Sequence, residues 1–197
     1  MRWMRRYAGL SVALGLLVIF GGCWTLSMNP LYTEKDLIVD PMLEGIWGDP
    51  ENPQDETWEF RLQDDKSYRL VVREDEQHLL INPEKDGLFE VHLLKLGENK
   101  FLDLFPEEPE GVNGFYKAHV IPAHSFLRMK LEGHVLSVAE LDVEWLQAEA
   151  DSSRLDIPYQ RREGTIVLTA STEELQKWVL AHLDEAFEDF EITKRLQ

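Results

Sequence analysis

Alternation of apolar and polar side chains with a period of two dominates the chain between residues 41 and 170. Apolar residues occupy every second position in 58–62 and again in 68–72, and the polar run 63–66 separates them. These two segments predict a β-hairpin with one buried face. Further strand-like segments follow, joined by short turns: 89–93, 100–105, 127–131 and 135–140. The repeated pattern predicts a mainly β fold, an antiparallel meander that forms a barrel or a sandwich.

Two helices are expected in addition to these strands. The first, at 142–150, is short and is inserted between strands. The second spans 172–190 and begins with Ser171 and Glu174, which are spaced as a capping box. Its apolar residues recur every three or four positions, so the C-terminal helix is predicted to be amphipathic and to pack one face.

The N-terminus has the features of an export signal. Residues 8–23 carry no charge, the seven residues before them include three arginines, and Cys23 is the only cysteine of the chain. A basic start, an apolar core and small residues before a cleavage site are typical of a secretory signal. Residues 19–23 resemble the bacterial lipobox, although Phe20 replaces the usual leucine. This resemblance implies cleavage before Cys23 and attachment of diacylglycerol to this cysteine, with palmitate among the acyl chains.

Two alternatives to lipidation of Cys23 remain open, an uncleaved membrane anchor and a free or buried thiol. The anchor is an alternative because about 20 apolar residues can span a bilayer. The expected organisation is a signal peptide at 1–22, a lipidated linker at 23–40 and one domain at 41–197. Both the lipidated and the anchored form tether that domain outside the cytoplasm, in the cell envelope.

The chain is strongly acidic, with 20 Lys and Arg against 37 Asp and Glu and a net charge of −17. Such a surface repels nucleic acid and anionic headgroups, so no nucleic-acid partner is expected. The membrane is expected as a partner only through the N-terminal lipid anchor. The sequence identifies no protein partner.

The start of the predicted domain contains Gly45-x-Trp47, which resembles the opening of lipocalins and their calycin relatives. The resemblance implies a closed barrel of about eight strands with an internal cavity, in which the tryptophan closes the lower end. Two features depart from that plan: no clear strand follows the C-terminal helix, and the helix at 142–150 separates two strands. The whole chain also resembles uncharacterised small lipoproteins of bacterial envelopes.

An internal cavity would be lined by aromatic residues of the strands. The candidate ligand-binding residues are Trp47, Trp58, Phe60, Tyr68 and Phe89. The alternative is that these side chains simply fill the core. Phe115 and Tyr116, which follow a turn, are expected at a rim, where they could gate an opening.

No motif for catalysis, cofactor binding or metal binding is recognisable. The six histidines are dispersed, with His119 and His124 the closest pair, and the glycines form no phosphate loop. Acidic runs lack the spacing of a calcium-binding loop, and no serine lies in a nucleophile elbow. We therefore expect a non-enzymatic protein without cofactors or metals that binds an apolar small molecule or lipid in its barrel. The alternative is an envelope scaffold with a filled barrel and acidic interaction loops, and a hydrolase with dispersed residues is a weaker third hypothesis.

Overall fold

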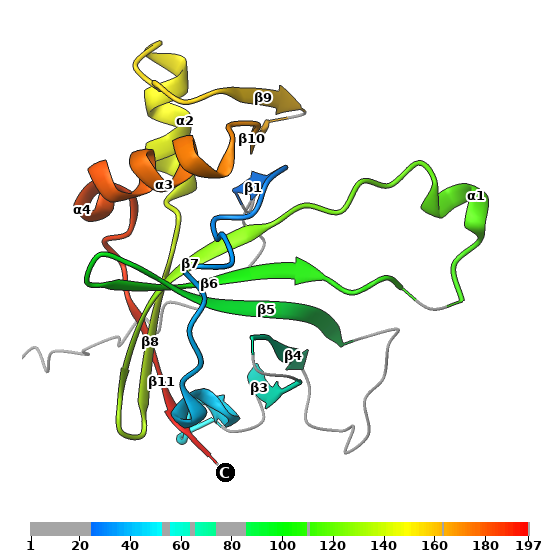
Figure 1. Cartoon of the computed structure of the whole chain (residues 1–197), viewed down its shortest axis with the longest axis vertical. Coiled ribbons are helices and arrows are strands. Elements are labelled where there is room, and N and C mark those ends of the chain that lie inside the picture. Colours follow the sequence, from blue (N-terminus) through cyan, green and yellow to red (C-terminus); the bar gives the residue numbers. More distant parts are fainter. Residues whose placement is uncertain are drawn as a thin grey trace, which may run out of the picture.

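A closed barrel of eight antiparallel strands forms the body of the protein (Figure 1). The computed structural model describes residues 25–52, 56–63, 66–73, 86–109, 111–162 and 164–196. In their order around the ring, the strands are β11 (Glu191–Arg195), β2 (Gly45–Gly48), β3 (Thr57–Leu62), β4 (Tyr68–Arg73), β5 (Gly87–Leu96), β6 (Asn99–Pro106), β7 (Ser125–Glu132) and β8 (Val135–Glu140). The predicted antiparallel meander and lipocalin-like barrel are confirmed.

The remaining elements lie outside the ring. A small sheet has the strand order β1 (Leu26–Ser27), β10 (Thr165–Leu168) and β9 (Tyr159–Arg162). The helices are the 3-10 helix η1 (Pro41–Leu43), α1 (Gly114–Lys117), α2 (Val143–Asp151), α3 (Thr172–Ala181) and α4 (Leu183–Ala186). Figure 1 shows α2 and α3 gathered with β9 and β10 at one side of the barrel. Among the described residues, no helix combines the length and the apolar character needed to cross a bilayer.

Alternation along the strands separates two apolar cores. One is the barrel interior, because all of its buried members except Leu43 of η1 come from seven of the barrel strands: Trp47, Phe60, Tyr68, Leu70, Val91, Leu93, Leu102, Leu104, Leu127, Met129, Leu136 and Val138. The other joins the outer barrel wall to the helices. There Phe101 of β6 meets Phe187 edge-on, with 5.8 Å between ring centroids. Neighbouring residues of one strand thus stabilise different cores, as the pleat of a strand requires.

Trp47 closes the end of the barrel where β2 begins. Its indole N–H donates to the carbonyl of Leu43 at 2.9 Å, and the guanidinium of Arg195 lies 4.8 Å from its ring centroid. Arg195 also donates to the carbonyl of Met42 in η1. The strands β11 and β2 and the 3-10 helix η1 are therefore held together around one aromatic ring.

The final strand is a correction to the sequence-based expectation. β11 follows the C-terminal helices and closes the ring by pairing with both β2 and β8. Its alternation is inverted: the apolar Ile192 is exposed, whereas Arg195 faces Trp47. A search for strands with an apolar buried face therefore passes over this segment.

Residues 25–40 are a second correction, because they do not form a linker outside the domain. Leu31 is completely buried, and β1 pairs in parallel with β10. The backbone N–H of Ile38 donates to the carbonyl of Leu93 at 2.9 Å. Backbone pairing and single apolar contacts leave no periodicity in the sequence, so this docking gives no sequence signal.

Both predicted helices are present, with different ends. Asp142 caps α2 by accepting from the backbone N–H of Trp145, and Ser171 and Glu174 form the predicted capping box of α3. The second helix ends earlier than residue 190. Its C-cap, His182, has φ −119° and ψ 28°, which is not helical, and only the four-residue α4 follows. The chain must turn there to bring β11 beside β8.

Candidate functional site

A long arm between β6 and β7 is the most distinctive feature of the barrel. The chain leaves the ring after Pro106, and the arm, described at residues 107–109 and 111–124, returns to β7 (Figure 1). Asn113 starts α1 at the far end of the arm, since its side chain accepts from the backbone N–H of Phe115 at 2.8 Å. His119 continues the turn, with its Nδ1 2.6 Å from the carbonyl oxygen of Phe115. The arm is therefore a folded projection.

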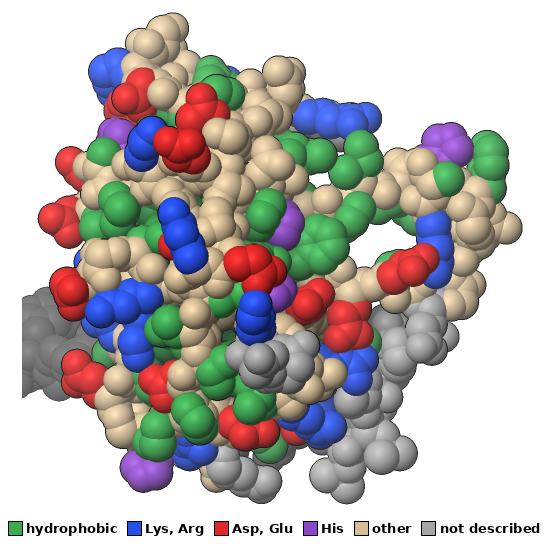
Figure 2. Space-filling model, viewed as in Figure 1, with side chains coloured by type: hydrophobic (Ala, Val, Ile, Leu, Met, Phe, Trp, Pro, Cys, Tyr) green, Lys and Arg blue, Asp and Glu red, His purple; other side chains and the backbone are tan. Residues whose placement is uncertain are grey.

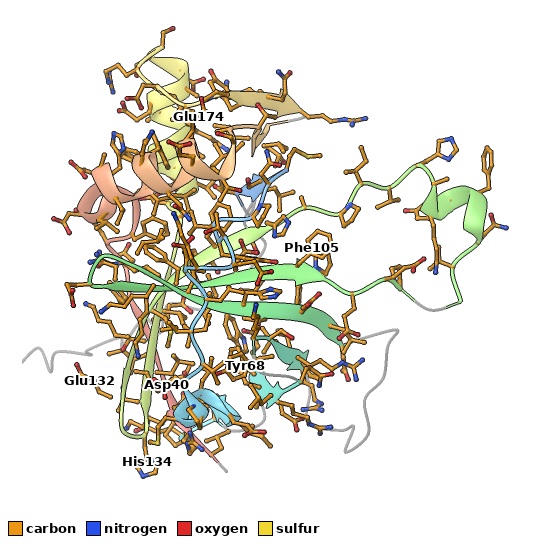
Figure 3. The ribbon with its side chains drawn as sticks, viewed as in Figure 1. Asp40, Tyr68, Phe105, Glu132, His134 and Glu174 are labelled. Atoms are coloured by element: carbon orange, nitrogen blue, oxygen red, sulfur yellow. The ribbon has the colours of Figure 1, made fainter. Side chains whose placement is uncertain are left out.

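Between the arm and the barrel lies a cavity of about 740 Å³ that is partly open to solvent, here called the arm cavity. Figure 2 shows the hollow between the arm and the body of the protein. Its walls are the ends of β4, β5 and β6 together with the arm. The apolar lining residues are Leu88, Phe89, Phe105, Pro106, Pro109, Val112, Tyr116, Val120 and Pro122. Figure 3 shows Phe105 near the base of the arm, with Tyr68 and Asp40 lower on the body of the protein.

Charged side chains frame this apolar lining. Arg69 donates to both carboxylate oxygens of Glu107, at 2.7 and 2.8 Å. Lys117 Nζ lies 2.8 Å from Glu108 Oε1, and this hydrogen bond and charge lower the pKa of the Glu108 carboxyl. The second pair joins the outgoing limb of the arm to α1. Such an arrangement can hold an apolar body and orient a polar head at the rim.

A buried carboxylate fixes the base of the arm. Asp103 is fully buried and accepts from the backbone N–H of Leu31 at 2.7 Å. Its other oxygen lies 2.6 Å from Nδ1 of His124, the residue just before β7. The ring of His124 lies 4.6 Å from that of Phe105, a wall residue of the arm cavity. Asp103 thus ties the N-terminal segment and the returning limb of the arm to the barrel wall.

The five aromatic candidates are distributed over two places. Trp47, Phe60 and Tyr68 are buried in the barrel interior, and Trp58 packs partly buried against the same cluster. Tyr68 is further fixed by its hydroxyl, which donates to the carbonyl of Asp40 and accepts from its N–H. Phe89 packs against this interior cluster and also lines the arm cavity. Of the five predicted ligand-binding residues, Phe89 is the one that borders the arm cavity.

The other wall residues escaped the sequence search. Leu88 and Phe105 occupy the outward-facing positions of their strands, where apolar residues are usually interpreted as contacts to another layer. Val112 and Val120 lie in a segment without periodicity. In this region, only Phe115 and Tyr116 were expected from the sequence to lie at the rim of an opening. In the structure, Tyr116 lines the cavity, and Phe115 is exposed at the end of the arm. Cys23 lies outside the described residues.

The histidines and acids form no shared ligand set in the part of the chain that the structure describes. No group of three or more His, Cys, Asp or Glu side chains there has the arrangement to hold a metal ion. His119 and His124, the closest pair in sequence, bond to separate partners, Phe115 and Asp103.

Three carboxylates meet where β11 closes the ring. Glu140 ends β8, Glu191 begins β11, and Glu56 directly precedes β3. Burial raises the pKa of Glu140 to about 7, with the charges of Glu191 and Glu56 adding to the effect. Burial, reinforced by Glu56, also raises the pKa of Glu191. Burial and the neighbouring charges thus disfavour ionisation of Glu140 where β11 pairs with β8.

Comparison with known proteins assigns no family. No family model, no curated protein and no solved structure matches the chain. The geometry of the arm cavity is therefore the basis for inferring a function, since a barrel fold alone does not specify one.

Proposed function

We propose that this protein is a membrane-tethered lipoprotein of the cell envelope that binds an apolar small molecule or a lipid without catalysing a reaction. We place the ligand in the arm cavity rather than in the barrel interior. The proposal concerns one site, formed by the arm and the outer ends of β5 and β6.

One observation carries this proposal, the size and lining of the arm cavity. Its volume of about 740 Å³ lies within the roughly 300–1,000 Å³ common for small-molecule sites. Nine of its lining residues are apolar, and charged pairs stand at the edge. The barrel interior instead contains large, fully buried side chains such as Trp47 and Phe60.

The membrane tether is proposed from the N-terminal sequence, with Cys23 as the lipid-attachment residue. Mass analysis of the denatured mature protein tests it. A chain that begins at Cys23 and carries acyl chains is expected. A chain that retains Met1 indicates an uncleaved anchor instead.

The scaffold hypothesis remains the second candidate, because the side chains packed inside the barrel favour it. In that case the barrel only supports its loops, and acidic segments meet a cationic partner. A partner that is recovered from envelope extracts and released by salt would support this alternative.

Native mass spectrometry of the full chain, extracted in detergent, tests ligand binding. We expect an additional non-covalent mass on the wild-type protein. Val112→Trp adds a large ring to the wall of the arm cavity and should remove that mass. Ile192→Trp adds the same ring to an exposed position on β11 and should retain it. A ligand that survives Val112→Trp, or a wild-type protein without any ligand, would contradict the proposed site.

A further inference from the structure

The far end of the arm exposes a cluster of large apolar side chains, here called the arm tip. Phe115, Tyr116, Val120 and Ile121 are 78%, 63%, 50% and 72% exposed. They lie within seven consecutive residues, and Figure 2 shows apolar side chains at the end of the projecting arm. Clustered exposure of this kind marks a surface that meets another apolar phase.

The arm tip contributes no acidic residue of its own, unlike most of the chain. No Asp or Glu occurs between residues 111 and 131, although the chain contains 37 of them and has a net charge of −17. The charged residue of the tip is Lys117, and it is paired with Glu108. An acidic body is repelled by anionic headgroups, so the arm tip, where Lys117 offsets the charge of Glu108, is the part that can approach a bilayer most closely.

The base of the arm lies beside the segment that leads to the proposed anchor. Ser27 and His124 exchange two backbone hydrogen bonds, each 2.8 Å long. Cys23 precedes Ser27 by four residues, and at ~3.4 Å per residue that stretch spans at most about 14 Å. A bilayer that holds Cys23 is therefore close to the point where the arm returns to the barrel.

We propose that the arm tip inserts into the lipid bilayer to which the protein is tethered. Aromatic and aliphatic side chains at the end of a folded loop fit the boundary between headgroups and acyl chains. Insertion would bring the adjacent arm cavity to the membrane surface, because Tyr116 and Val120 belong to both the tip and the cavity wall. The inference rests on the proposed membrane attachment and adds a second contact to it.

Photocrosslinking of the full chain reconstituted into vesicles tests this inference. Phe115 is replaced by p-benzoylphenylalanine, which preserves an apolar aromatic side chain, and the matched control carries the same group at Ile192, exposed on β11. The vesicles are made of phosphatidylcholine with phosphatidylglycerol. Flotation measures membrane attachment, and mass analysis of the irradiated protein identifies what the probe has captured.

We expect the chain to float with the vesicles and position 115 to yield lipid adducts several-fold more often than position 192. Flotation without a lipid adduct at position 115 would overturn the inference and leave the membrane tether intact. A crosslink to a second copy of the chain would also overturn it, in favour of an interface between copies. Failure to float together with absence of adducts would refute both the tether and the inserted tip.

Discussion

The carboxyl group of Glu140 lies at the end of β8, the strand that pairs with β11 to close the barrel. We expect Glu140→Gln to stabilise the protein at alkaline pH. The pKa of this carboxyl is raised to about 7 from its ordinary value of 4.5, mainly by burial. The native state therefore favours the protonated acid. The stability from this group is complete below about pH 4.5 and is lost as the pH rises towards about 7.

The upper limit of this stabilisation follows from the change in the pKa of Glu140. A change from 4.5 to about 7 corresponds to at most ~3.4 kcal/mol, at ~1.36 kcal/mol per pKa unit. Because the side chain keeps some contact with water, we expect about 1–2 kcal/mol. Glutamine resembles the protonated acid in shape and lacks its charge, so the gain should appear above the raised pKa and vanish near pH 4.5.

Denaturant unfolding of wild type and variant, at about pH 5 and about pH 8, measures this difference. Glu132→Gln, at the exposed end of β7, is the matched control and should leave the free energy of unfolding unchanged at both pH values. Equal stability of Glu140→Gln and wild type at about pH 8 would refute the reasoning. So would a gain that is just as large at about pH 5.

Three further substitutions test the packing around the site and the barrel. Asp103→Asn should cost about 2–4 kcal/mol, because it leaves the side chain of His124 without its buried carboxylate, whereas exposed Asp189→Asn should be nearly neutral in the same unfolding assay. Ser171→Ala should cost about 1 kcal/mol through loss of the capping box, measured as a lower unfolding midpoint. Arg195→Ala should speed amide hydrogen exchange in β11, because it removes the contacts to Trp47 and η1; unchanged exchange would contradict that role.

The strands of the barrel were predictable because a half-buried strand imposes a period of two on its sequence. β3 to β8 all place apolar side chains in the interior at alternate positions. β11 breaks the rule, since Ile192 is exposed and Arg195 packs on Trp47. The closure of the ring therefore could not be predicted from the sequence. It became evident only from the pairing of β11 with β2 and β8 in the structure.

The arm cavity was less predictable for a different reason. Its walls combine outward-facing residues near the ends of two strands, Leu88 and Phe105, with residues of an irregular loop. Neither group produces a periodic pattern, and their proximity depends on how the arm folds back. The sequence pointed to aromatic side chains, but only Phe89 of the candidate set borders this cavity.

The packing of residues 25–40 against the barrel could not be predicted from the sequence for the same reason. Leu31 is one buried side chain in a segment without alternation, and its backbone N–H binds a carboxylate 72 positions further along the chain. A contact between single groups so far apart in sequence leaves no local signal. It nonetheless fixes the start of the described chain against β6, beside the base of the arm.

The most direct test of the proposed function is to map where an apolar ligand sits. The full chain in lipid nanodiscs is irradiated with a fatty acid that carries a diazirine near the end of its acyl chain, and the labelled residues are identified by mass analysis. We predict adducts at Leu88 and Phe105, the barrel-side walls of the arm cavity, that excess unlabelled fatty acid suppresses. Adducts confined to the interior residues Leu93 and Leu102, or none that the competitor suppresses, would contradict the account.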